Sequence, residues 1–211
     1  SMFNENYPFY TGSSEYMKSH FKEFSNYVKN EHMGSNSKII EIGSNDGTLL
    51  KNFIKNKDNI LGIEPSKNVA LRSIAEGVPT LNEFFSLKNV SKLKKFLGNT
   101  DLIFSSNCIC HIPDLDNLIK GVDLLLSKNG TFIFEEPYLG SMFNKTSYDQ
   151  IYDEHIYMFS VSSIKKIFNL YDFELVNALP QVTHGGSMRY VIKRKNNSSI
   201  SNELNLLLEN E

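Results

Sequence analysis

The sequence has few cysteines and no excess of basic residues, and each shortage excludes a class of protein. Cys108 and Cys110 are the two cysteines among 211 residues, and cysteines this close together rarely form a disulfide. Two thiols are too few for a four-cysteine zinc site. Lys plus Arg total 22 and Asp plus Glu total 24, which gives a net charge of −2. We therefore expect no nucleic-acid partner.

Long apolar runs are also missing from the chain. Polar residues interrupt every apolar run well before the about 18 residues that a membrane span requires, and no segment resembles a signal peptide. The two cysteines are expected to be free thiols in a reducing compartment. We therefore predict a cytoplasmic protein with no membrane partner.

Apolar strand patterns alternate with helical patterns along most of the chain. Strands are predicted at residues 38–43, 59–64, 78–81, 101–105, 130–135, 173–179 and 187–193. Helices are predicted at residues 15–29, 48–55, 67–76, 87–97, 115–126 and 162–170. This alternation requires parallel crossovers, so it predicts an α/β fold with a mostly parallel sheet and helices on both faces. The last two predicted strands could form a hairpin through the loop that contains Gly185 and Gly186, which would give the sheet an antiparallel edge strand.

The same pattern suggests three parts of the chain. Residues 1–36 are expected to form a helical cap or substrate segment, and residues 37–195 form the α/β domain. The tail, residues 196–211, turns leucine-rich and is expected to be a tail or the start of a linker helix. The length suits one ordinary domain with a sizeable core.

A glycine-containing loop joins the first predicted strand to its helix. Gly43 permits a sharp turn and a close backbone approach to a ligand, and Asn45 tolerates left-handed backbone. The dinucleotide fingerprint G-x-G-x-x-G is absent, because Asn45 stands at its second glycine. The pattern instead resembles the first motif of class I methyltransferases. This resemblance implies an S-adenosylmethionine (SAM) site that includes Glu41, Gly43, Asn45, Asp46 and Gly47.

Later strand ends extend this predicted cofactor site. Glu64 ends the second predicted strand, where a carboxylate can accept two hydrogen bonds from ribose hydroxyls. Aromatic residues after the third strand would flank the adenine, and residues after the fourth strand would lie beside the methionine part. The further predicted contacts are Pro65, Ser66, Glu83, Phe84, Phe85, Ser105 and Asn107. The product would be S-adenosylhomocysteine (SAH).

A second motif indicates the substrate. The stretch Tyr148-Asp-Gln-Ile-Tyr-Asp-Glu-His-Ile-Tyr-Met-Phe-Ser160 resembles the Tyr-Asp-Glu-His signature of sugar C-methyltransferases of deoxysugar pathways. The similarity extends over nearly the whole chain. Members of that family act on dTDP-4-keto-deoxysugars at carbon 3. The resemblance implies a nucleotide-linked keto-deoxysugar as substrate.

The chain also departs from that family pattern. Family members are usually longer, with a cysteine-rich zinc-binding module before this region and a further α/β domain after it. The sequence therefore corresponds either to the central domain of a longer parent chain or to a minimal member. In the first case, the zinc-binding and C-terminal domains are expected partners.

The chemistry of carbon methylation explains the residues of the second motif. A bond between carbon and a methyl sulfonium requires an enolate, and histidine suits proton removal because its pKa lies near neutral pH. The resemblance implies that His155 is the base. If the segment is helical, Tyr152 shares its face, and its hydroxyl could stabilise the enolate oxygen. Glu154 would hold a sugar hydroxyl or orient a ring, and His111 would support catalysis.

Further residues are predicted to contact the substrate. Arg189 could pair with a phosphate or a carboxylate. The predicted substrate contacts are Tyr7, Tyr10, Tyr148, His184, Gly185 and Arg189. Because the Asp153-Glu154 pair lacks a second histidine at metal spacing, we predict no metal site.

Two alternatives to a sugar C-methyltransferase stay open. An O- or N-methyltransferase acting on a small metabolite would use the same cofactor pocket without enolisation. A non-catalytic module that binds SAM or a nucleotide sugar would bind without turnover. Deuterium exchange at a sugar carbon would distinguish a C-methyltransferase from the first alternative. The effect of His155→Ala on turnover would distinguish it from the second.

Overall fold

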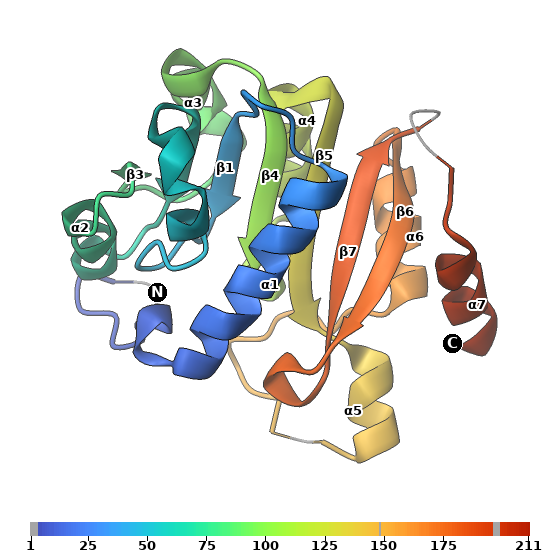
Figure 1. Ribbon diagram of the computed structural model, residues 1–211. Helices are drawn as coiled ribbons and strands as arrows, with labels where there is room; N and C mark the ends of the chain where they lie inside the picture. Colours follow the sequence, from blue (N-terminus) through green and yellow to red (C-terminus); the bar gives the residue numbers. More distant parts are fainter. Residues whose placement is uncertain (1–3, 148, 196–198) are drawn as a thin grey trace.

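A twisted sheet with helices on both faces forms the centre of the molecule. The computed structural model describes residues 4–147, 149–195 and 199–211. In this part of the chain, seven strands lie in the order β3-β2-β1-β4-β5-β7-β6 (Figure 1). The strands are β1 (Ile39–Ile42), β2 (Ile60–Ile63), β3 (Thr80–Leu81), β4 (Thr100–Ser106), β5 (Leu126–Pro137), β6 (Phe173–Gln181) and β7 (Ser187–Arg194).

Strand directions confirm the predicted α/β fold. Neighbouring strands from β3 to β5 pair in parallel, whereas β7 is antiparallel to both β5 and β6. The strand β7 thus runs between β5 and the edge strand β6, which itself lies parallel to β5. The late hairpin was predicted to pair antiparallel, and it does.

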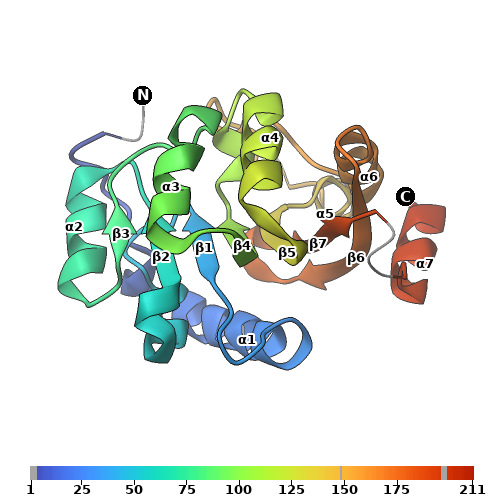
Figure 2. The same cartoon turned by 90° about the horizontal axis from the view of Figure 1, so that it is seen from above.

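Helices cover both faces of the sheet, as Figure 2 shows in the view from above. The α-helices are α1 (Glu15–Glu31), α2 (Lys67–Ala75), α3 (Val90–Leu97), α4 (Leu115–Leu125), α5 (Leu139–Lys145), α6 (Val161–Asn169) and α7 (Asn202–Asn210). One apolar core joins α3, α4 and α6 to one face, and a second joins α1 to the other. Ile39 and Ile40 point into different cores, as the two-residue period of a strand requires.

The first helix forms where the apolar spacing predicts it. The Ser14 hydroxyl accepts a hydrogen bond from the backbone N–H of Met17 and caps the helix. Phe24 and Val28 are fully buried against the sheet, and Phe24 makes an edge contact with Phe104 of β4 at 5.3 Å between ring centroids. The helix α1 therefore belongs to the core. In the described residues, no helix combines the length and apolarity needed to cross a bilayer.

Two predicted helices differ from the observed elements. Residues 48–55 were predicted to be helical, but this region forms a 3-10 helix, η2 (Leu50–Asn59). The side-chain amide of Asn52 donates to the carbonyls of Thr48 and Leu49, which an α-helix would use for its own ladder. The predicted helix at 87–97 is divided into η3 (Leu87–Asn89) and α3.

The region after β5 contains a helix that the pattern did not predict. Residues 138–161 were treated as a long insertion, and the short helix α5 lies within it. Thr146 ends this helix in left-handed backbone, with φ of 54°. The strand β5 is also longer than predicted, because Leu126 pairs with Thr100 ahead of an irregularity in β4.

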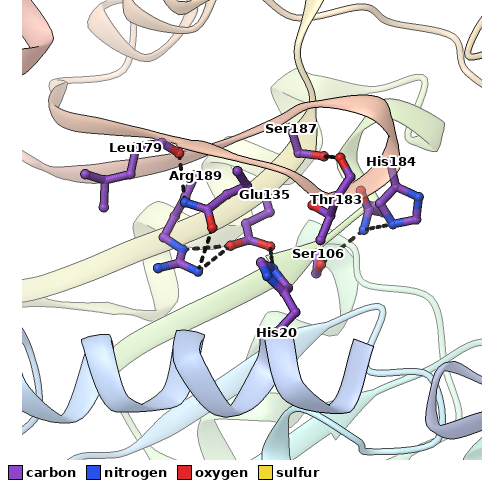
Figure 3. A network of polar contacts seen from close by, with 10 residues as sticks. His20, Ser106, Glu135, Leu179, Thr183, His184, Ser187 and Arg189 are labelled. Atoms are coloured by element: carbon purple, nitrogen blue, oxygen red, sulfur yellow. Dashed lines mark hydrogen bonds and ion pairs between the residues drawn. The ribbon is translucent and has the colours of Figure 1, made fainter. Parts of the chain in front are cut away.

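A buried ionic network fastens α1 to the sheet (Figure 3). The carboxylate of Glu135 on β5 lies 2.7 Å from the Arg189 guanidinium of β7 and 2.6 Å from Nε2 of His20 on α1. Arg189 also lies over the rings of Phe24 and Tyr27, at 4.5 and 5.1 Å from their centroids. Burial alone would raise the pKa of Glu135, but the hydrogen bond from His20 and the charge of Arg189 hold it below its ordinary value.

We predict that Arg189→Met strongly destabilises the protein. The substitution leaves Glu135 buried with half of its partners, and breaking a buried pair in this way typically costs about 3 to 5 kcal/mol. Urea denaturation measures the loss. As a control, Lys120→Met at the exposed pair with Asp116 should leave the free energy of unfolding nearly unchanged. Equal effects of the two substitutions would show that the buried network contributes no special stability.

Candidate functional site

A cavity of about 610 Å³ opens at the carboxyl ends of β1 and β4. These strands are neighbours in the sheet. The chain continues from β1 to β2 and from β4 to β5, so the two connections lead in opposite directions across the sheet. Open α/β sheets bind ligands at such a point. The loop after β1, the segment after β4, the N-terminal segment and the Tyr152–His155 segment all line the cavity.

The glycine loop after β1 forms one side of this cavity. Gly43 has φ of 71°, and a Cβ at this position would lie 2.6 Å from Sγ of Cys108, so only glycine fits. Asn45 is also left-handed, with φ of 47°. Its backbone N–H donates to Oε2 of Glu64 at 3.0 Å, while the N–H of Ser66 donates to Oε1 at 2.7 Å. The loop and the end of β2 thus hold each other through the Glu64 carboxylate.

Two acidic side chains give this side of the cavity its electrostatic character. Glu41 and Glu64 both line the cavity and are both buried. Burial raises the pKa of both, and for Glu41 the neighbouring Asp46 and Glu64 raise it further. Oε2 of Glu41 is buried with no hydrogen-bond partner in the described residues. A cationic or hydrogen-bond-donating ligand would satisfy this side.

The N-terminal segment closes over the same loop. The N–H of Thr11 donates to Oδ1 of Asn45 at 2.9 Å, and the N–H of Gly12 donates to Oδ2 of Asp46 at 2.8 Å. Asn45 and Asp46 were predicted to contact the cofactor. In the structure their side chains instead bind the backbone of the N-terminal segment. Phe9, Met17 and Phe21 of this segment also line the cavity. The spacing of Met17 and Phe21 predicted the buried face of a helix and gave no signal of a cavity wall.

The Tyr-Asp-Glu-His segment is docked on the turn that follows β4. The N–H of Ile156 donates to the carbonyl of Cys110 at 2.9 Å, and Tyr157 donates through its hydroxyl to the carbonyl of Pro113 at 2.7 Å. His111 Nδ1 lies 2.7 Å from the carbonyl oxygen of Glu154. These contacts bring the His111 and His155 rings to 4.9 Å between centroids.

Tyr152 and His155 form a hydrogen-bonded pair within this segment. The segment lies between α5 and α6 and forms a turn, so the conditional prediction of a helix was wrong. The N–H of His155 donates to the carbonyl of Tyr152 at 3.0 Å, and this turn places the tyrosine hydroxyl 2.8 Å from Nε2 of His155. The two rings lie 4.1 Å apart between centroids.

A backbone carbonyl determines which ring nitrogen of His155 carries the proton. Nδ1 of His155 lies 2.8 Å from the carbonyl oxygen of Gln150, and a carbonyl only accepts. Nδ1 must therefore carry the proton, which leaves Nε2 as an acceptor for the Tyr152 hydroxyl. Burial lowers the pKa of His155 and raises that of Tyr152. Near neutral pH the pair thus consists of a neutral imidazole and a protonated phenol.

Three potential metal ligands meet near this pair. Cys110, His111 and His155 place one ligand atom each within 4.8 Å of one another. Burial, reinforced by the charge of Glu136, raises the pKa of the Cys110 thiol and opposes the thiolate that zinc requires. The two ring nitrogens of His155 already have hydrogen-bond partners, because Nε2 bonds to Tyr152 and Nδ1 bonds to Gln150. The absence of a metal site stays a prediction.

His184 also lines the cavity and lies in the loop before β7 (Figure 3). Its Nε2 lies 3.0 Å from Nδ2 of Asn107. Both residues are left-handed, with φ of 49° for His184 and 50° for Asn107. Non-glycine residues held in this conformation concentrate at functional sites.

The cavity brings most of the predicted site residues together. The predicted residues in its wall are Tyr7, Glu41, Gly43, Asn45, Glu64, Pro65, Phe84, Phe85, Asn107, His111, Tyr152, His155 and His184. Among the described residues, those predicted but outside the wall are Tyr10, Asp46, Gly47, Ser66, Glu83, Ser105, Glu154, Gly185 and Arg189. Tyr148 lies outside the described residues.

Several of these departures have a clear physical cause. Ser105 points away because strand side chains alternate, so its hydroxyl donates to the Ile42 carbonyl and Ser106 faces the cavity. Glu83 pairs with Lys92 on the surface. The guanidinium of Arg189 is buried against Glu135, in the network described above, so it is not available to a ligand in the cavity.

Other departures follow from local contacts. The Tyr10 hydroxyl accepts a hydrogen bond from Asn68 at 2.8 Å, and Gly185 offers its carbonyl to Lys145 at 2.5 Å. Glu154 contributes its backbone carbonyl to His111, while the residue itself is exposed. The sequence pattern gave no signal for these backbone roles.

Comparisons with known proteins agree with this geometry. A family model described as a methyltransferase domain matches residues 14–178, from the start of α1 into β6. The chain is also 30% identical over 150 residues to the C-methyltransferase NovU of Streptomyces niveus. That match covers 71% of this chain and 36% of the relative, so the chain spans just over a third of the relative's length.

Solved structures share the fold at low sequence identity. Magnesium protoporphyrin IX methyltransferase (ChlM) from Synechocystis PCC 6803, with bound SAH, gives a TM-score of 0.63 at 13% identity over 84% of this chain and 83% of that one. An S-adenosylmethionine-dependent methyltransferase from Clostridium acetobutylicum ATCC 824 gives 0.61 at 14% identity over 87% and 93%. The fold is that of class I methyltransferases, and with the family match it identifies the chain as a member of the SAM-dependent methyltransferase domain family.

Proposed function

We propose that this domain methylates a carbon of a nucleotide-linked keto-deoxysugar through an enolate. One observation supports the proposal most strongly: the Tyr152–His155 pair lines the same cavity as the glycine loop. A base that can form an enolate therefore stands within one enclosure with the cofactor loop. The similarity to a protein named as a C-methyltransferase supports the same reaction type.

The residues of the loop side fit SAM. The ligand carries a sulfonium and an ammonium, and Glu41 and Glu64 give this side of the cavity acidic character. The unpartnered Oε2 of Glu41 would accept a hydrogen bond from such a cation. Glu64 holds two N–H groups, one on each oxygen, and retains acceptor capacity for ribose hydroxyls. Phe84 and Phe85 would flank the adenine. When bound, SAM supplies an electrophilic methyl group.

The histidine side would generate the carbon nucleophile. Neutral His155 accepts a proton at Nε2, and the Tyr152 hydroxyl bonded to that atom stands in the cavity wall. The proton beside the sugar ketone would pass to the tyrosine oxygen as the hydroxyl proton moves to Nε2. The imidazolium that forms keeps its Nδ1–H bond to Gln150. His184 and Asn107, which also line the cavity, would contact the sugar.

Glu64→Gln is predicted to weaken SAH binding. The amide group loses acceptor capacity toward the ribose and the loop N–H groups, and hydrogen bonds to charged groups contribute about 1.5 to 3 kcal/mol, or about 10- to 150-fold in affinity. Isothermal titration calorimetry measures the dissociation constant. Glu83→Gln is the matched control, since Glu83 pairs with Lys92 on the surface, and it should bind SAH as the wild type does. Unchanged affinity in Glu64→Gln would remove Glu64 from the cofactor site.

His155→Ala is predicted to abolish proton exchange at the sugar. With a dTDP-4-keto-6-deoxysugar in D₂O, the wild-type protein should exchange the proton beside the ketone, followed by NMR. Loss of a general base typically costs about 100- to 10,000-fold. His32→Ala is the control, because His32 bonds to Tyr27 away from the cavity. Methylation of oxygen or nitrogen without carbon exchange would instead favour the alternative enzyme class.

The exchange rate should also depend on pH in a defined direction. Burial lowers the pKa of His155 below its ordinary value of 6.5, and the neutral form is the base. The rate should therefore rise with pH through a midpoint below 6.5 and reach a plateau by neutral pH. Initial rates between pH 4.5 and pH 8 measure this profile. A midpoint above 6.5 would contradict the neutral Tyr152–His155 pair.

A further inference from the structure

Glu136 is a buried acid that the proposed chemistry does not use. It follows Glu135 near the end of β5 and has no exposed surface. Burial raises its pKa to about 7, against the hydrogen bonds that Cys110, Ile109 and Cys108 donate to it. Among the described residues it is absent from the cavity wall, so it does not touch a ligand there. A carboxyl group in this position requires a structural reason.

Its partners are three consecutive backbone N–H groups of one turn. Oε1 accepts from the N–H of Cys108 at 3.0 Å and of Ile109 at 2.7 Å, and Oε2 accepts from the N–H of Cys110 at 3.3 Å. These groups open the 3-10 turn η4 (Ile109–His111), and such groups have no partner inside their own helix. Glu136 therefore fixes the turn from the neighbouring strand.

This turn positions two of the histidines that line the cavity, His111 and His155. His111 is its last residue, and Nδ1 of His111 bonds to the carbonyl of Glu154. The carbonyl of Cys110 accepts hydrogen bonds from the N–H groups of Ile156 at 2.9 Å and of Tyr157 at 3.3 Å. The segment that contains His155 thus bonds directly to the backbone that Glu136 caps.

We infer that Glu136 is a positioning residue for the His155 base. It fixes the turn at residues 108–111, the turn fixes the segment at residues 154–157, and this segment holds the imidazole against Gln150 and Tyr152. The same contacts keep the proton of His111 and of His155 on Nδ1. The inference rests on the proposed function for the role of His155 as base, but the arrangement of the two rings does not.

Glu136→Gln is the direct test. The amide keeps the size of the side chain but places N–H donors where Oε1 or Oε2 accepted, so at least one backbone N–H loses its partner. A misplacement of about 1 Å can cost about 100-fold in rate, and we expect a fall of that order in the sugar exchange rate. The dissociation constant of SAH should change far less than the exchange rate, since Glu136 bonds to the turn after β4 and to no residue of the glycine loop.

Nitrogen NMR gives a readout that a merely structural role would not change. In ¹⁵N-histidine-labelled wild-type protein at neutral pH, His155 should show a protonated Nδ1 and an unprotonated Nε2, and Nδ1 of His111 should carry a proton. In Glu136→Gln, both signals should move toward a mixture of the two forms. Glu203→Gln is the matched control, because Glu203 is exposed on α7, and its spectrum and exchange rate should match those of the wild type.

Glu136→Asp covers the case in which the glutamine variant fails to fold. The shorter carboxylate keeps the charge but cannot reach all three N–H groups, so it should show a smaller change of the same kind. A folded variant at residue 136 with wild-type histidine signals and exchange would overturn the inference. If the wild-type protein exchanges no sugar proton, the proposed function fails, and the nitrogen spectra still decide the positioning role.

Discussion

The cavity exists because β1 and β4 are neighbours whose connections diverge. The chain continues from β1 to β2 toward one edge of the sheet, and from β4 to β5 toward the other edge. No crossover can cover the point between them, so their carboxyl ends border an opening. The glycine loop of β1 and the turn after β4 face each other across it. The packing of Gly43 against Cys108 sets how closely these two backbones approach.

Two chemically different walls meet at this opening. The loop wall is acidic, with Glu41 and Glu64 buried beside the glycine loop. The opposite wall carries His111, Tyr152, His155 and His184, and burial lowers the pKa of His155 and of His184. An acidic wall suits a cationic methyl donor, and a neutral basic wall suits proton removal. The N-terminal segment joins the two, because it binds Asn45 and packs α1 on the sheet through the Glu135 network.

The sequence predicts features that depend on the spacing of apolar residues and on residues that permit unusual backbone angles. Strand and helix alternation predicts the sheet, because buried parallel strands have few other solutions. Gly43 and Glu64 are predictable since a sharp turn and an acid at the next strand end are local signals. No local pattern assigns a role to Glu136. Its role depends on three N–H groups about 27 residues earlier in the chain, a relation that no local pattern contains.

Arg189 and Ser105 show the opposite limit. Both residue types suit a ligand, and both sequence positions lie close to the site. Arg189 is instead buried against Glu135, and Ser105 faces Ile42 rather than the cavity. Tertiary pairing decides such cases, and a strand that shifts by one residue reverses every side chain. The segment of Tyr152 and His155 places these two side chains together through a turn, although helical spacing would also do so.

The position of the transferred methyl group tests the central claim, which is that one cavity joins a methyl donor to an enolate. The protein would be incubated with SAM carrying a ¹³C-labelled methyl group and a dTDP-4-keto-6-deoxysugar, and the product would be examined by carbon NMR. The account predicts a labelled methyl group coupled to a sugar carbon beside the ketone. A label bonded to oxygen or nitrogen would contradict it, because that transfer needs no enolate.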